Sequence, residues 1–135
     1  MTATLVDSNV LIDILGNGSP WTAWSDEALI EALEHGAVFV NQVVCAEISI
    51  GFPTVEECDW SLEVRGIERM PMPWPASFLA GRAYVEYRRR GGARRSPLPD
   101  FFIGAHAAVD GLRLLTRDPS RYRTYFPTVE LIAPE

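Results

Sequence analysis

The chain contains no lysine, since all 12 of its basic residues are arginine. This absence excludes every mechanism that needs a catalytic or phosphate-binding lysine, including the P-loop. Cysteine is also scarce, and Cys45 and Cys58 form neither a disulfide framework nor a CxxC metal-binding motif, so we expect reduced, partly buried thiols. The longest apolar runs, 37–40 and 43–46, are too short to span a membrane, and residues 1–9 do not resemble a signal peptide. We therefore expect a cytoplasmic protein.

The apolar content is high enough for one folded domain. Of 135 residues, 47% are hydrophobic, which excludes a disordered chain and predicts a single α/β domain over residues 1–135. Residues 1–81 carry two arginines and twelve acids, whereas residues 82–135 carry ten arginines and six acids. The net charge of −6 argues against nucleic-acid binding, but the arginines of the C-terminal part can still contact phosphates locally. Net charge alone therefore does not decide the partner.

Short apolar runs alternate with helical patterns along the chain. The predicted strands are 4–6, 37–40, 67–70, 112–116 and 129–132. The predicted helices are 9–15, 21–35, 42–50, 54–65, 78–90 and 98–109. This alternation predicts right-handed crossovers and a mostly parallel sheet of about five strands with helices on both faces. Ligands of such sheets bind at the carboxyl ends of the strands.

Four acidic residues lie where this fold would place a ligand. Asp7 follows the first predicted strand, and Asp118 follows the fourth by two residues. Glu47 lies on an apolar helix face, where an unpaired charge costs several kcal/mol, so it needs a cation or a proton. Asp100 follows Pro99 in the first turn of a helix and has small or apolar helical neighbours.

Each of these acids also has a purely structural interpretation. Asp7 and Asp118 can cap helices, and Glu47 can pair with an arginine. Asp100 can be stabilised by the dipole of the helix in whose first turn it lies. If all four acids converge, however, their negative charges repel one another, and the arrangement becomes favourable when a divalent cation neutralises them. A set of oxygen ligands without His or Cys favours Mg²⁺ or Mn²⁺ over Zn²⁺.

Such a cluster is suited to phosphodiester hydrolysis, because a bound cation activates water and stabilises charge on the phosphate. Ser8 and Thr116 could hold a ligand or a water molecule, and Asn9 could bond a carboxylate or the substrate. The alternative for these three residues is ordinary capping and strand-end hydrogen bonding. His106 is expected to be hydrogen-bonded or exposed rather than a base, because it lies off the helical face of Asp100.

The chain resembles the PIN domain over nearly its whole length. The resemblance is carried, in this order, by segment 5–13, Glu47, and segments 98–100, 104–108 and 116–118. In length the chain is similar to VapC toxins, the ribonucleases of type II toxin–antitoxin pairs. The resemblance implies a three-layer α/β/α sandwich, RNA cleavage dependent on Mg²⁺ or Mn²⁺, and frequent homodimers. It also implies inhibition by a VapB antitoxin whose tail occupies the active-site groove. The catalytic and metal-binding residues that it implies are Asp7, Glu47, Asp100 and Asp118, supported by Asn9, Thr116 and Ser8.

Other functions are less consistent with the residues present. A receiver domain needs a lysine, and a haloacid-dehalogenase-type phosphatase needs an Asp-x-Asp pattern that Asp7-Ser8-Asn9 breaks. The serious alternative is a catalytically inactive PIN-like module that binds a basic peptide or RNA, against which the complete set of four acids argues. Arginines that could contact an RNA backbone, or form a solvated surface, are Arg88, Arg89, Arg90 and Arg117. The resemblance does not settle the role of the stretch 88–95.

Overall fold

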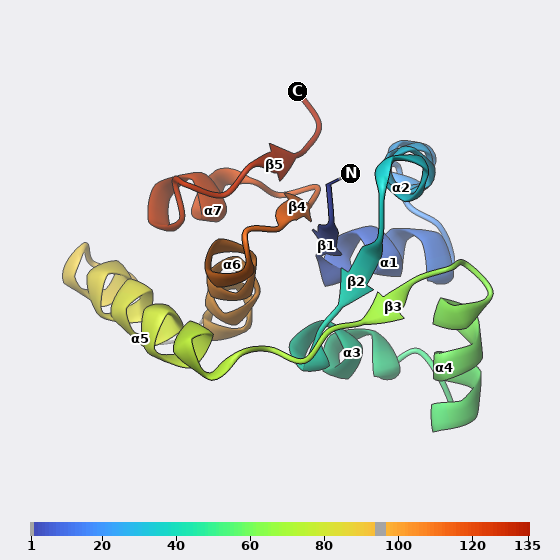
Figure 1. Cartoon of the computed structure of the whole chain (residues 1–135), viewed down its shortest axis with the longest axis horizontal. Helices are drawn as coiled ribbons and strands as arrows, with labels where there is room; N and C mark the ends of the chain where they lie inside the picture. Colours follow the sequence, from blue (N-terminus) through green and yellow to red (C-terminus); the bar gives the residue numbers. More distant parts are fainter. Residues whose placement is uncertain (1, 94–96) are drawn as a thin grey trace.

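The computed structural model describes residues 2–93 and 97–135 and contains one central parallel sheet (Figure 1). The strands are β1 (Thr4–Val6), β2 (Val38–Val40), β3 (Glu68–Arg69), β4 (Arg113–Leu115) and β5 (Leu131–Ile132). They are arranged in the order β3-β2-β1-β4-β5, and every pairing is parallel. The predicted five-stranded parallel sheet is confirmed, although most strands are shorter than the apolar runs that indicated them.

Seven helices connect the strands in the described part of the chain. They are α1 (Ser8–Leu15), α2 (Thr22–His35), α3 (Gln42–Ser49), α4 (Val55–Glu63), α5 (Trp74–Arg89), α6 (Leu98–Asp110) and α7 (Ser120–Tyr125). As predicted, Asn41 caps α3, where its side chain accepts the Val44 N–H. Helix α5 begins four residues before the predicted start at 78, because Pro75 lies in the first turn, where a missing N–H breaks no helical hydrogen bond. Helix α7 was not predicted.

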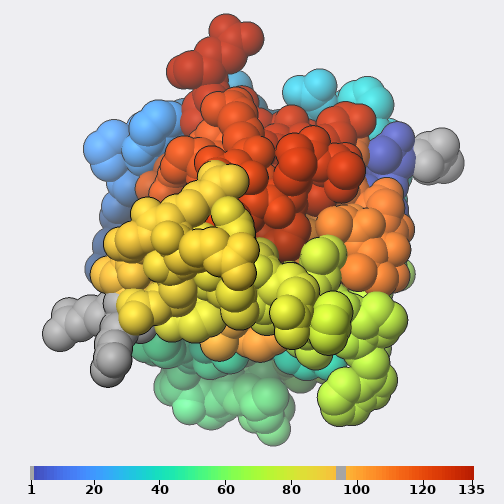
Figure 2. Space-filling view, turned by 90° about the vertical axis from the view of Figure 1, so that its left-hand side faces the viewer, coloured from blue at the N-terminus to red at the C-terminus, as the bar shows by residue number. Residues whose placement is uncertain are grey.

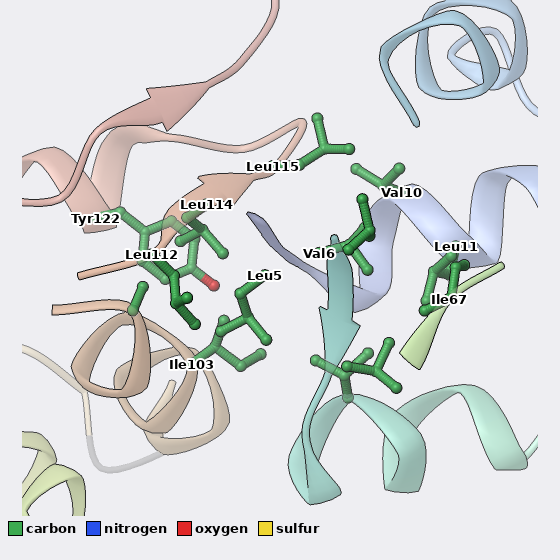
Figure 3. Close-up of a cluster of buried hydrophobic side chains, with 14 of the residues drawn as sticks. Leu5, Val6, Val10, Leu11, Ile67, Ile103, Leu112, Leu114, Leu115 and Tyr122 are labelled. Atoms are coloured by element: carbon green, nitrogen blue, oxygen red, sulfur yellow. The ribbon is translucent and has the colours of Figure 1, made fainter. Parts of the chain in front are cut away.

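The core lies on both faces of the sheet, which confirms the three-layer α/β/α architecture. Leu5 and Val6 of the central strand β1 are fully buried and point in opposite directions. Figure 3 shows Leu5 beside Ile103 of α6, whereas Val6 lies beside Val10 of α1. The apolar face of each helix therefore covers one face of the same strand.

The strand register brings distant residues together at the carboxyl edge of the sheet. Val6 pairs with Leu115, so the next residues, Asp7 and Thr116, are neighbours although they are 109 positions apart. The Asp7 N–H donates to the Leu115 carbonyl at 2.8 Å, which extends the ladder by one residue. Helices α1 and α3 both begin at this edge, directly after β1 and β2.

No helix within residues 2–93 and 97–135 is long and apolar enough to cross a membrane. The two cysteines are unpaired thiols, as expected, with Cys58 buried and Cys45 partly buried.

Candidate active site

Asp7 is the most enclosed of the four predicted acids, with only 3% of its surface exposed. Its Oδ2 accepts hydrogen bonds from Thr116 Oγ1 and from the Tyr122 hydroxyl, both at 2.9 Å. Weaker contacts come from Ser8 Oγ at 3.5 Å and Asn9 Nδ2 at 3.4 Å. Asp7 occupies the N-cap position of α1, but its side chain makes no capping hydrogen bond. Helix capping therefore does not explain this buried carboxylate.

Within the described part of the chain, Asp7 forms no ion pair with an arginine or histidine. Burial raises the pKa of Asp7 to about 6, and the negative charge of Asp100 adds to the increase. Hydrogen bonds from Tyr122 and Thr116 lower the pKa but only partly offset these effects. A nearby cation would stabilise the charged form of this group.

Glu47 extends from α3 towards Asp7 and is half-buried. Ser8 Oγ donates to Glu47 Oε1 at 2.9 Å and also lies 3.5 Å from Asp7, so one hydroxyl contacts both acids. Burial raises the pKa of Glu47, the Ser8 hydrogen bond lowers it, and the charge of Asp100 raises it further. The structural alternative was an arginine partner, but no ion pair to Glu47 occurs in the described ranges.

Asp100 is the third residue of α6 and has an ion-pair partner. Arg121 of α7 donates from Nη1 to Asp100 Oδ2 at 2.7 Å. Burial nevertheless raises the pKa of Asp100; the Arg121 hydrogen bond and charge oppose this, and the charge of Asp118 adds to it. The arginine therefore compensates the buried charge only in part.

Asp118 is the outermost member of the set and is exposed. Its N–H donates to Thr116 Oγ1 at 3.1 Å, and its Oδ1 accepts from Ser120 Oγ at 3.4 Å. The capping interpretation fails, because Pro119 occupies the N-cap position of α7. Asp118 lies within electrostatic range of Asp100 and forms the solvent side of the cluster.

The supporting residues form a hydrogen-bonded link between α1 and the loop after β4. Asn9 Nδ2 donates to Thr116 Oγ1 at 3.3 Å, and Asn9 Oδ1 accepts the Arg117 N–H at 3.2 Å. Thr116 is fully buried, so its hydroxyl has a defined position against Asp7. Ser8, Asn9 and Thr116 all contact the acids or each other.

A second buried network connects the two helices that carry Glu47 and Asp100. His106 of α6 is fully buried, with Nδ1 3.1 Å from Asn41 Nδ2 and Nε2 3.0 Å from Asp110 Oδ2. Because Asn41 Oδ1 accepts from the Val44 N–H, its amide donates to His106 Nδ1, which leaves the proton on Nε2. Burial lowers the pKa of His106, consistent with this neutral ring, and the expectation of a hydrogen-bonded histidine is confirmed.

The donor set fits a hard divalent cation in its chemistry. The four acids offer only oxygen atoms, and the pKa values of Asp7, Glu47 and Asp100 are raised, chiefly by burial. The side chains do not form a closed cage, however. Across residues 2–93 and 97–135, no three His, Cys, Asp or Glu side chains are grouped closely enough to hold a metal ion. In this conformation, Arg121 occupies an oxygen of Asp100.

The arginines predicted to contact RNA have different surroundings. Arg117 forms an ion pair with Asp13, with 2.7 Å between Arg117 Nε and Asp13 Oδ2, and the arginine side chain is 30% exposed. At the end of α5, Arg88 donates to the Gly92 carbonyl, while Arg89 and Arg90 pair with Glu86 and remain exposed. The rest of the predicted basic stretch, residues 94–95, lies outside the described residues.

Sequence reasoning missed two residues of the site, Arg121 and Tyr122. Both belong to α7, which has only six residues and was not recognised. Tyr122 and Phe126 are aromatic residues four positions apart, and this spacing is the local sequence signal that could have indicated a helix there. Both side chains are buried in the structure. Without that helix, neither the phenol against Asp7 nor the guanidinium against Asp100 could be placed.

Comparison with known proteins supplements this geometry. A search of curated proteins found no match. Among solved structures, the chain is similar to one of VapBC2 from Rickettsia felis bound to a DNA fragment from its promoter, with a TM-score of 0.75 and 15% identity over 99% of this chain and 100% of that chain. It is also similar to one of VapBC-1 from nontypeable Haemophilus influenzae, with a TM-score of 0.72 and 13% identity over 98% of each chain. For VapBC-5 from Mycobacterium tuberculosis the TM-score is 0.61, at 20% identity over 99% of this chain and 100% of that chain.

At these identities the solved structures establish the fold alone. The family profile described as the PIN domain matches residues 4–127, which include β1, the whole of α7 and all four acids. The chain therefore belongs to the PIN domain family.

Proposed function

We propose that this chain is a divalent-cation-dependent endoribonuclease of the VapC type, held inactive by a VapB-type antitoxin. PIN domains are typically nucleases that use divalent metal ions, and the similar structures named above are of toxin–antitoxin complexes. The observation that carries the proposal is the environment of Asp7. Its carboxylate is buried and accepts several hydrogen bonds, yet its pKa is raised to about 6.

In this proposal Asp7, Glu47, Asp100 and Asp118 hold Mg²⁺ or Mn²⁺ through carboxylate oxygens. When bound, such a cation supplies activation of water and stabilisation of charge on the phosphate. Thr116 and Tyr122 orient the Asp7 carboxylate through Oδ2, while Oδ1 lies 3.5 Å from the Ser8 hydroxyl.

The Ser8 hydroxyl lies between the carboxylates of Asp7 and Glu47. The Ser8 hydroxyl orients Glu47 through Oε1. Burial raises the pKa of Glu47, so a cation beside it would favour the charged form that acts as a ligand.

The proposed macromolecular partners are RNA and the antitoxin. Arg88, Arg89 and Arg90 end α5 with clustered positive charge, which supports a contact with the RNA backbone. A homodimer remains a prediction; Trp74 and Phe78, which are 89% and 68% exposed on α5, are apolar surface suited to such a contact.

The test is an RNA cleavage assay with the purified chain freed of any antitoxin. We expect cleavage of an RNA oligonucleotide with Mg²⁺ or Mn²⁺ and none in excess chelator. Asp7→Asn should reduce the cleavage rate by more than about 100-fold, since it removes a proposed ligand. Asp26→Asn, at an exposed position of α2, is the matched control and should leave the rate unchanged.

Two outcomes would contradict the proposal in different ways. Cleavage that persists in chelator would exclude the metal-dependent mechanism. RNA or basic-peptide binding without any cleavage at all would favour the alternative of a catalytically inactive interaction module.

A further inference from the structure

The ion pair between Arg121 and Asp100 joins two elements at the edge of the acidic cluster. It links α7 to the first turn of α6, with Nη1 and Oδ2 2.7 Å apart. The two side chains are 36% and 34% exposed, so the pair borders solvent. Within residues 2–93 and 97–135, this is the one ion pair that involves any of the four proposed ligands.

The guanidinium of Arg121 has a second contact that does not depend on Asp100. Its Cζ lies 5.9 Å from the centre of the Tyr87 ring of α5, within the range of a cation–π interaction. Tyr87 is itself packed edge-on against Phe101 and Tyr125. Figure 2 shows the yellow part of α5 against the red segment that contains α7, and the ring contact between Tyr87 and Tyr125 joins these two helices. A guanidinium that leaves Asp100 can therefore remain over Tyr87.

Water reaches about one third of each side chain, so the pair contributes less to stability than a fully buried ion pair and a stronger cation can replace the guanidinium. A divalent cation carries twice the charge of a guanidinium and binds carboxylate oxygens directly. Both would use the same carboxylate, and Asp118 adds negative charge beside it that favours the stronger cation.

We propose that Arg121 is an internal competitor for the divalent cation, which must displace its guanidinium from Asp100 in order to bind. The inference rests on the proposed function, since it takes Asp100 as a cation ligand. The consequence is that the resting site is occupied by the chain's own positive charge and binds a divalent cation more weakly than its four carboxylates would allow.

Isothermal titration with Mn²⁺ tests the competition without any activity measurement. We expect Arg121→Gln to bind Mn²⁺ about threefold to tenfold more tightly than the unaltered chain, from the strength of a pair that borders solvent. Arg123→Gln removes the same charge from an exposed position of α7 and is the matched control, expected to stay within about twofold of the unaltered chain. In an Asp100→Asn background, Arg121→Gln should no longer change the affinity.

A second measurement uses the unaltered chain. The Arg121 Nε–H signal in nitrogen-15 NMR, assigned by its loss in Arg121→Gln, should shift in proportion to Mg²⁺ saturation as the guanidinium leaves Asp100. The proposed competition would be wrong if the unaltered chain and the Arg121→Gln variant bound Mn²⁺ equally well, or if the Arg121 signal did not shift on addition of Mg²⁺. Either result would leave the proposed function intact. If neither protein binds Mn²⁺, the proposed cation site is wrong and the competition is wrong with it.

Discussion

The two ends of helix α1 each carry a buried aspartate, and the two differ in their charge partner. Asp7 and Asp13 are both 3% exposed, and both accept hydroxyl hydrogen bonds. Burial acts to raise the pKa of Asp13, but hydrogen bonds and charge, led by Arg117, outweigh it and hold the pKa below its usual value. The pKa of Asp7 is raised to about 6. Two differences therefore separate these carboxylates: Asp7 lies deeper in the protein than Asp13, and Asp13 has an arginine as its charge partner.

One short loop after β4 supplies a hydrogen-bond partner to each of the two aspartates. Thr116 donates to Asp7, and the next residue, Arg117, donates to Asp13 from Nε at 2.7 Å and from Nη2 at 3.2 Å. The same segment therefore completes a structural ion pair at one end of α1 and leaves an uncompensated carboxylate at the other. We interpret Asp13 as a stabilising residue and Asp7 as a residue kept for a cation.

The largest expected effect is on Asp13. Asp13→Asn keeps the shape of the side chain but removes the charge that Arg117 binds, and it sets an amide N–H against one arginine donor. We expect the free energy of unfolding at neutral pH to fall by about 3 kcal/mol, at the lower end for a buried pair because Arg117 is 30% exposed. Urea unfolding measures this, and an unchanged midpoint would show that the ion pair between Asp13 and Arg117 does not stabilise the fold.

The same substitution at Asp7 should act in the opposite direction. The rise in pKa from 3.8 to about 6 corresponds to at most about 3 kcal/mol of destabilisation at neutral pH. Asp7→Asn should recover about 1–2 kcal/mol of this, because its carbonyl still accepts from Thr116 and Tyr122, and the Ser8 hydroxyl can turn to accept from its amide. Urea unfolding in a chelator measures the change. A loss of stability as large as that of Asp13→Asn would erase the contrast between the two residues.

The smallest effect is a difference in the pH dependence of stability. Because the pKa of Asp7 is higher in the folded chain than its ordinary value of 3.8, the folded chain binds more protons than the unfolded chain between about pH 4 and about pH 6. The contribution of Asp7 to stability is therefore fully present below about pH 4 and is lost as the pH rises through about 6. The stability gained by Asp7→Asn should shrink to near zero at about pH 4 and be fully present above about pH 7.

Asp13 supplies the opposite sign in the same experiment. Its folded pKa is lowered, so its contribution is present above its unfolded pKa and is lost as the pH falls through the folded value. The destabilisation by Asp13→Asn should therefore shrink in acid. Parallel pH curves for the two variants would mean that the two carboxylates titrate alike, contrary to the structure.

Local sequence was sufficient to predict most of the fold. The predicted strands and six of the helices follow from apolar spacing and from caps such as Asn41, which act over a few residues. It was insufficient for α7, because a helix of six residues is stabilised mainly by the packing of Tyr122 and Phe126 against distant elements. The acids themselves were predictable from their positions after strands, but the phenol and the guanidinium that contact them were not.

The sequence by itself determined the residue types, the parallel α/β architecture and the positions of acids at strand ends and early helix turns. Only the tertiary structure decided which carboxylate has an arginine partner and which has none among residues 2–93 and 97–135. Asp7 and Asp13 lie six positions apart at the two ends of one helix, whereas the arginine that pairs with Asp13 is 104 positions away from it. The physical reason is that the energy of a buried charge depends on the groups within a few ångströms of it, and chain folding brings those groups from distant parts of the sequence.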